Sequence, residues 1–383
     1  MKPTAELRES ASLSTTGRTS PEKRRTLWRR WRRAARRRGK LFAGILIVSL
    51  FYAVALFADF LAPYDYRAQS RREPMAAPSI VHWRDAQGGW HARPFVYARR
   101  LVDPLARRYE EETTRAYPLA LFANGYQYRL LGLFPTGRHL FGLQDQAGAT
   151  APRVQLLGTD SLGRDRLSRL LLASRFSLLV GPAGTLLASA LGILLGCIAG
   201  FSGRWVDAVL MRAADAMMAL PSLVLILAAR AAFPLELPPA RAALLMISIF
   251  AVVGWAEMAR VTRGLVLALR RREFVLAAES IGLSKLRVLF RHILPNAARP
   301  LLVQVTLMLP YFLLTETALS FLGIGLQEPE ASWGNMLAAA GDINLLRLHT
   351  FTLLAPALAI FVFVLGVRLL SDGLSAAGEQ RRS

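Results

Sequence analysis

The sequence predicts an all-α membrane protein with six transmembrane helices and a partly β extracytoplasmic insert. Hydrophobic residues make up 53% of the 383 residues and charged residues only 19%, below the roughly 25% of soluble domains. The apolar residues gather in charge-free runs that are long enough to cross a bilayer. Between the first two runs lies a long polar segment, part of which alternates like a strand.

The first forty residues form a basic tail. Residues 1–40 hold 14 Lys and Arg against 3 Glu, and they run directly into the apolar segment that starts at Leu41. A basic block beside a span is attracted to anionic headgroups and stays on the cytoplasmic side. The net charge of +22 is therefore assigned to contact with membrane lipid, and we expect no nucleic-acid partner.

Six runs qualify as spans. The first, at 41–58, belongs to a transmembrane segment at 41–62 and is too long for the core of a cleaved signal peptide. The others are expected at 176–203, 213–232, 241–257, 300–322 and 349–367. Pro221 interrupts the third span. The second contains the four-residue spacing of Gly192, Gly196 and Gly200, which lets a neighbouring helix approach closely.

Orientation follows from the basic residues of the short loops. Residues 261–299 hold eight Lys and Arg, whereas 231–240 and 325–346 hold none. This asymmetry places 261–299 and both termini, with Arg381 and Arg382, in the cytoplasm. The expected division is a tail at 1–40, the first span at 41–62, an insert at 63–157, a five-helix core at 158–375 with a loop at 265–296, and a cytoplasmic tail at 376–383.

The insert contains local strand and turn signals. Residues 126–130 alternate like a strand, and 134–137 are expected to form a turn before His139. We expect a small, partly β unit. Its function stays open between a spacer that covers a neighbouring subunit and a surface that contacts a ligand.

The loop at 265–296 is too regular for a simple tether. Its first half carries an apolar stripe at helical spacing, formed by Phe274, Ala277, Ala278 and Ile281. Gly282 interrupts this helix, Ser284 can cap a second one, and Leu294-Pro295 is expected to end it. The pattern predicts two short helices joined at a glycine, parallel to the membrane. Two functions remain open, a helix lying on lipid and a docking site for a partner.

This loop resembles the EAA loop of binding-protein-dependent ABC importer permeases. That pattern is Glu-Ala-Ala, three residues, Gly, nine residues, a variable apolar position, one residue and Leu-Pro. Ala277, Ala278, Gly282, His292, Leu294 and Pro295 stand at the matching positions. Leu276 replaces the leading Glu, and Glu273 one turn earlier is the candidate substitute. The resemblance implies that an ATPase is contacted through Glu273, Ala277, Ala278, Glu279, Gly282, His292, Leu294 and Pro295, chiefly through Ala277, Ala278 and Gly282.

Four further segments resemble the dipeptide/oligopeptide (C-type) branch of these permeases. They lie at 158–169, 211–223, 316–323 and 332–336, so the resemblance covers about residues 158–375. A structural clamp at the outer surface is expected from Gly158, Asp160, Gly163, Arg164, Asp165 and Arg169, with Asp160, Arg164 and Asp165 pairing. Glu257 and Glu316 are expected near span ends, where water or headgroups can reach them, which favours a structural capping role for each. The insert resembles the enlarged periplasmic loop of some oligopeptide and antibiotic-peptide permeases.

The resemblance implies a type I ABC importer permease of the bacterial inner membrane that forms half of the translocation path for di- and oligopeptides. Its implied partners are a homologous second permease, two cytosolic ABC ATPases and a periplasmic substrate-binding protein. The chain has no Gly-x-x-x-x-Gly-Lys-Ser/Thr phosphate loop. We therefore expect no enzymatic activity, no metal and no cofactor on this chain, with ATP and Mg²⁺ used by the partner ATPases.

Two kinds of alternative remain. Similar motifs occur in permeases for nickel complexes and other small solutes. A secondary transporter would instead show ionisable residues near mid-bilayer or an inverted repeat, and neither is clear in the sequence. An intramembrane enzyme is disfavoured because no acid pair or Ser–His pair lies at membrane depth. The residues that bind the substrate are not singled out by the sequence.

Overall fold

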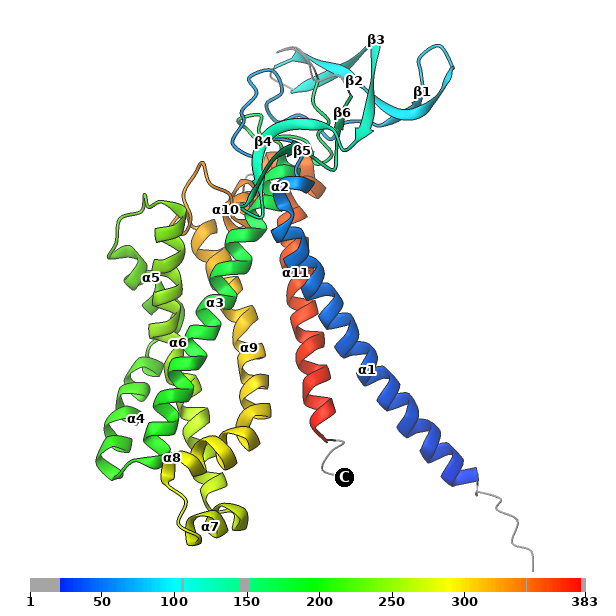
Figure 1. Ribbon diagram of the computed structural model, residues 1–383. Coiled ribbons are helices and arrows are strands. Elements are labelled where there is room, and N and C mark those ends of the chain that lie inside the picture. Colours follow the sequence, from blue (N-terminus) through cyan, green and yellow to red (C-terminus); the bar gives the residue numbers. More distant parts are fainter. Residues whose placement is uncertain (1–20, 105–106, 145–151, 342, 380–383) are drawn as a thin grey trace, which may run out of the picture.

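The computed structural model describes residues 21–104, 107–144, 152–341 and 343–379. The basic tail is thus described only from Pro21, and Arg381 and Arg382 lie outside the described residues. The helices are α1 (Pro21–Leu56), α2 (Ala58–Leu61), α3 (Arg166–Phe201), α4 (Arg204–Ala219), α5 (Ser222–Ala231), α6 (Pro239–Arg270), α7 (Glu273–Ser280), α8 (Lys285–Val288), α9 (Leu294–Phe321), α10 (Trp333–Ala338) and α11 (Ile343–Glu379). Figure 1 shows the strands gathered at one end of the long helices, with α7 and α8 at the other end.

Five helices of the described chain are long and apolar enough to cross a membrane: α1, α3, α6, a continuous helix Lys285–Phe321 and α11. The pair α4 and α5 passes the same test together but is bent by 86°. The bend coincides with Pro221, whose missing amide hydrogen and fixed ring disfavour a continuous helix. The span expected at 213–232 is therefore a broken one, and its first helix begins at Arg204.

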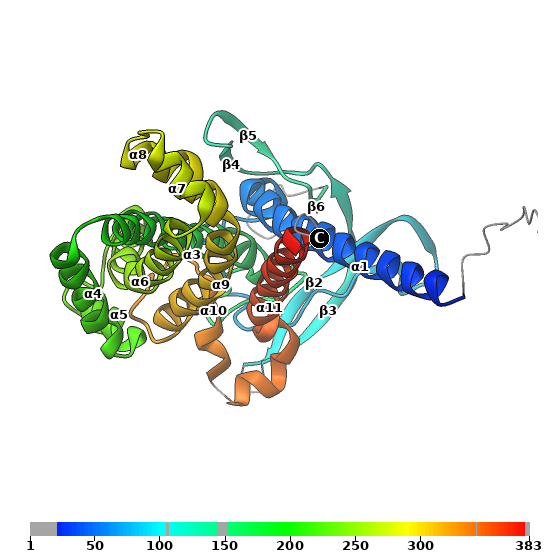
Figure 2. The ribbon, with the colours of Figure 1, turned by 90° about the horizontal axis from the view of Figure 1, so that it is seen from below.

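Close helix packing forms the centre of the bundle. A Cβ atom added at Gly192 would lie 2.7 Å from the carbonyl oxygen of Trp255, and one at Gly196 would lie 2.5 Å from that of Ala259. This confirms the close approach expected from the glycine spacing, and α6 is the helix that approaches α3. Figure 2 shows α3, α6 and α9 between α4 and α5 on one side and α1 and α11 on the other.

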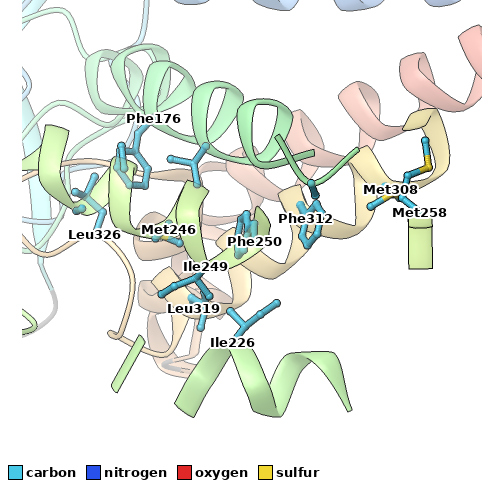
Figure 3. Packing of buried hydrophobic residues seen from close by; sticks show 14 of the residues in the cluster. Phe176, Ile226, Met246, Ile249, Phe250, Met258, Met308, Phe312, Leu319 and Leu326 are labelled. Atoms are coloured by element: carbon cyan, nitrogen blue, oxygen red, sulfur yellow. The ribbon is translucent and has the colours of Figure 1, made fainter. Parts of the chain in front are cut away.

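The main apolar core lies between α3, α5, α6 and α9. The ring of Phe250 in α6 stacks on Phe312 in α9 with centroids 4.8 Å apart. Figure 3 shows this pair within the cluster, with Met308 beside it. The core thus joins the two helices that flank the loop at 271–284.

In its described residues the insert has six strands: β1 (His82–Arg84), β2 (Trp90–Asp103), β3 (Arg108–Leu121), β4 (Asn124–Leu130), β5 (Phe134–Arg138) and β6 (Phe141–Leu143). They form a sheet of order β1-β2-β3-β6 and a separate β4-β5 hairpin. The strand expected at 126–130 lies within β4. The turn expected at 134–137 is wrong, because the turn lies at Leu131 and Gly132, which have positive φ. Pro135 is tolerated because β5 is an edge strand.

The insert is tied to the end of the first membrane helix. The buried ring of His139 lies with Nδ1 2.9 Å from the carbonyl oxygen of Asp59 and Nε2 3.0 Å from that of Tyr126. The side-chain amide of Gln155 donates to the Glu73 carboxylate at 2.7 Å. These buried polar contacts join the end of the β4-β5 hairpin to α2, and the segment that precedes α3 to the segment that follows α2.

Candidate functional site

The loop between α6 and α9 begins with the short helix α7, which ends in a Schellman motif. The amide of Gly282 donates to the Glu279 carbonyl at 3.0 Å, and the amide of Leu283 donates to the Ala278 carbonyl at 3.2 Å. Gly282 has φ +84°, and a Cβ added there would meet nothing within 4 Å. Glycine is therefore required for its backbone conformation rather than for space. The break expected at this residue is present.

The apolar residues of α7 divide between a buried face and an exposed face. Val275 and Ala278, 0% and 4% exposed, pack into a cluster with Cys197 of α3 and Val266 of α6. Phe274, Ala277 and Ile281 are exposed. The exposure of these three residues agrees with an apolar stripe that is open to lipid or to a partner. The expectation that Ala278 lies open to a partner is wrong, since its side chain faces the protein's own core.

The exposed part of the loop remains apolar. Its exposed large side chains are Phe274, Leu276, Ile281, Leu286 and Phe290, here called the docking face. Leu276, at the position where the family pattern has Glu, is 53% exposed. Ala277, Glu273 and Glu279 are exposed on the same helix. Exposed apolar residues gathered on one short segment indicate an interaction surface.

The second half of the loop is continuous with α9. Leu294-Pro295 does not end the helix as expected, because α8 passes through the π-helical turn Leu289–Ile293 directly into α9. Pro295 is tolerated since it stands in the first turn of α9, where its missing amide hydrogen breaks no α-helical bond. Ser284 occupies the cap position of α8 but makes no side-chain capping bond. His292 lies half-buried inside the π turn.

The loop is anchored to the rest of the bundle at the end of α6. The guanidinium of Arg270 donates to the Gly200 carbonyl at 2.8 Å and lies 4.9 Å from the centre of the Phe201 ring. Arg263 pairs with Asp207 and Arg260 with Asp215, which ties α4 to α6. These contacts join α3, α4 and α6 at this end of the bundle.

The helices that enter and leave the loop also line a groove of about 440 Å³. The groove lies at the break between α4 and α5 and is called the transport groove below. Its lining residues are Met217, Met218, Leu220, Ser222, Val253, Gly254, Glu257, Gln304, Leu307, Met308, Tyr311 and Phe312. Two polar pairs stand in it: Gln304 donates to Glu257 at 2.8 Å, and the Ser222 and Tyr311 hydroxyls are 2.6 Å apart.

Sequence reasoning did not assign the groove residues. An ionisable residue inside a span was the available signal, but Glu257 was read as the end of a span at 241–257. Helix α6 continues to Arg270, so Glu257 lies well inside it. Glu316 was also expected to be reached by water or headgroups. That expectation is wrong, because its side chain is fully buried and accepts a hydrogen bond from Ser320 at 2.9 Å.

The expected clamp lies at the opposite end of the molecule, where α3 begins. Arg164 contacts Asp160 at 2.6 Å and Glu328 at 2.5 Å, and Arg169 contacts Glu328 at 3.0 Å. Both arginine side chains are almost fully buried. Gly158 and Gly163 have positive φ and leave no room for a Cβ against the carbonyls of Ala76 and Ser70. The clamp therefore joins the start of α3 to the loop that follows α9.

Asp165 takes a different place from the one expected. Its carboxylate pairs with neither clamp arginine but caps α3, accepting hydrogen bonds from the Ser168 amide at 2.7 Å and hydroxyl at 2.6 Å. Burial raises the pKa of the Asp165 carboxyl to about 6, and these hydrogen bonds offset part of that effect. The sequence could not separate the two aspartates because both lie within reach of Arg164 along the chain.

Residues 192–383 match the family model described as "Binding-protein-dependent transport system inner membrane component". Residues 26–78 match the "N-terminal TM domain of oligopeptide transport permease C". The first match contains α7, α8, α9 and every residue of the transport groove. The two family matches thus agree with the resemblance seen in the loop.

Three curated relatives share this similarity. The oligopeptide transport system permease protein OppC of Bacillus subtilis (strain 168) is 38% identical over 220 residues, which cover 57% of this chain and 70% of that protein. The di/tripeptide transport system permease protein DppC of Pseudomonas aeruginosa (strain UCBPP-PA14) is 40% identical, covering 58% and 71%. The dipeptide transport system permease protein DppC of Alkalihalophilus pseudofirmus is 38% identical, covering 57% and 70%.

Proposed function

The chain belongs to the family of binding-protein-dependent transport system inner membrane components, and we propose that this permease subunit forms half of a peptide path driven by ATP hydrolysed in partner subunits. Its relatives are permease subunits for oligopeptides and dipeptides. The relatives' cargo and the methionine-lined groove both favour peptides here. The transport groove is the wall that this subunit contributes to the path.

One observation carries the proposal: the helices that line the groove are the same helices that hold the loop. Helix α6 runs into α7 after a two-residue connection at Arg271 and Arg272, and α8 is continuous with α9 through the π turn. Val275 and Ala278 fix α7 to the core, and the Gly282 cap fixes its end. A partner that displaces α7 must therefore move α6 and α9, and with them the two sides of the groove.

The proposed partners follow from the two ends of the molecule. The α7 end carries the basic loop and is proposed to face the cytoplasm, where two ABC ATPases bind ATP and Mg²⁺. The strands at the opposite end (Figure 1) are proposed to face the periplasm and the substrate-binding protein. A homologous permease completes the path, both termini lie in the cytoplasm, and this chain itself binds no cofactor and catalyses no reaction.

Reconstitution in liposomes tests the proposal. The complete complex of both permeases, the ATPases and the binding protein should take up a radiolabelled tripeptide only when ATP is supplied on the ATPase side. The purified chain alone should neither hydrolyse ATP nor let the peptide pass. Downhill movement of the peptide through the chain alone would instead identify a secondary transporter.

A further inference from the structure

We propose that Glu257 is the residue at which the transport groove binds the ammonium group of its cargo. The proposal rests on the function proposed above and names the chemistry of the same path. Among the lining residues Glu257 is the one acidic residue, and none is Lys or Arg. The groove therefore carries a single negative charge on an otherwise uncharged wall. A site of this kind favours cations.

Glu257 lies in the interior of α6, far from both ends of the helix. It lies 18 residues after Pro239 and 13 before Arg270, or roughly 27 Å and 20 Å along the helix at 1.5 Å per residue. Its neighbours Ala256 and Met258 are buried, but Glu257 itself is exposed on the groove side. Charges inside membrane segments are unfavourable and mark solute pathways when they face a cavity.

The charge of Glu257 is not neutralised within the described residues. The nearby arginines of α6 are engaged elsewhere, Arg260 with Asp215 and Arg263 with Asp207. The hydrogen bond to Glu257 comes from the uncharged amide of Gln304 on α9, at 2.8 Å. This amide orients one carboxylate oxygen and leaves the negative charge available to a cation.

The remaining lining residues fit a ligand with one constant cation and variable side chains. Met217, Met218 and Met308 are unbranched and adapt to different apolar shapes. Ser222 and Tyr311 add a polar pair without charge. A volume of about 440 Å³ lies in the range of small-ligand sites. Peptides match this description because each has an amino-terminal ammonium group while its side chains vary.

The geometry also links this contact to the loop. Glu257 stands on α6 and Gln304 on α9, the helices at the two ends of the loop. Displacement of α7 changes the separation of these helices and therefore the distance between the Glu257 carboxylate and the Gln304 amide. A contact that must release its ligand has to be weak, so we expect Glu257 to contribute about tenfold in preference, equivalent to ~1.4 kcal/mol.

The test compares two peptides in the complete complex reconstituted in liposomes. ATP-driven uptake of a tripeptide with a free amino terminus is measured against its N-acetylated form, each at concentrations that saturate the binding protein. Glu257→Gln should lower the ratio of free to acetylated uptake about tenfold, while Glu257→Asp should largely preserve it. Glu236→Gln, an exposed carboxylate on the loop before α6, is the matched control and should leave the ratio unchanged.

The ratio separates this contact from the binding protein, because that subunit is identical in all variants. An unchanged ratio in Glu257→Gln, or an equal loss for both peptides, would overturn the proposal while ATP-driven uptake by the wild type still supports the permease function. Absence of ATP-driven uptake in the wild type would instead overturn the function. If Glu257→Gln fails to assemble, Gln304→Lys provides the second test. Its ammonium group would stand beside Glu257 and pair with that carboxylate, so the ratio should fall; an unchanged or higher ratio would contradict the assignment.

Discussion

Aspartate at each of the two adjacent alanines of α7 should separate folding of the loop from docking of a partner. Ala278 is 4% exposed and packs with Val275, Val288 and Ile293, so its aspartate would place a carboxylate in an apolar cluster. Ala277 is exposed on the same helix, so its aspartate would meet water in the isolated chain. The two variants introduce the same charge one residue apart.

The expected magnitudes differ several-fold. An unpartnered carboxylate at 278 should destabilise the fold by about 3 kcal/mol or more. The aspartate at 277 should change the free energy of unfolding by less than about 1 kcal/mol. It also places a charge beside the docking face, and a desolvated, unpaired charge there disfavours an apolar contact with a partner.

Three measurements distinguish the outcomes: thermal unfolding of the purified complex, co-purification of the ATPases, and ATP-driven uptake. Ala278→Asp should lower the unfolding temperature and the amount of assembled complex. Ala277→Asp should keep the unfolding temperature of the chain but lose co-purification of the ATPases or ATP-driven uptake. Ala277→Ser and Ala278→Ser are the uncharged controls. Native stability of Ala278→Asp, or full uptake by Ala277→Asp, would refute the assignment of the two faces.

Three further predictions concern the caps and the clamp. Gly282→Ala should destabilise the end of α7 by about 1 kcal/mol, because residue 282 has a φ of +84°, and Gly282→Asn should destabilise it by less. Equal unfolding temperatures of the alanine variant and the wild type would argue against a backbone requirement. Since burial raises the pKa of Asp165 from 3.8 to about 6, its protonated form stabilises the fold below pH 3.8 and this contribution is lost as pH rises through 6. It amounts to roughly 3 kcal/mol, so Asp165→Asn should flatten thermal stability against pH between 4 and 6, and an unaltered profile would contradict this. Glu328→Gln leaves Asp160 as the one carboxylate partner of Arg164 and Arg169 among the described residues. It should lower stability in thermal unfolding by about 1–3 kcal/mol and leave ATPase turnover of the assembled complex unchanged. Loss of turnover at native stability would show that the clamp is not merely structural.

The sequence was most informative where one local pattern determines one structural feature. Charge-free length predicted the five long helices, and Pro221 predicted the weak point of the remaining span, which the structure bends by 86°. The spacing of Gly192 and Gly196 predicted close helix contact, because only small residues let backbones approach this far. Gly282 predicted the break after α7 for a comparable reason, its positive φ.

Features that depend on tertiary packing were not predictable in the same way. Which face of α7 is buried depends on Cys197 of the distant helix α3 and on Val266 of α6. The sequence therefore did not show that Ala278 packs inward while its neighbour Ala277 stays exposed. Pro295 was interpreted as the end of a helix because the sequence does not distinguish a proline that ends a helix from one that follows a π turn. Glu257 looked like the end of a span because apolar length alone does not show how far a helix continues.

The most direct test of the account is the identity of the neighbour of α7 in the membrane. A photo-crosslinking benzoylphenylalanine at position 276, in the complete transporter in native membranes, should form an adduct with the subunit that carries the ATP-binding phosphate loop, identified by mass spectrometry. The same probe at position 121, where Leu121 of β3 is 73% exposed at the opposite end, should form no adduct with that subunit. An adduct only with lipid at 276, or an ATPase adduct at 121, would contradict the account.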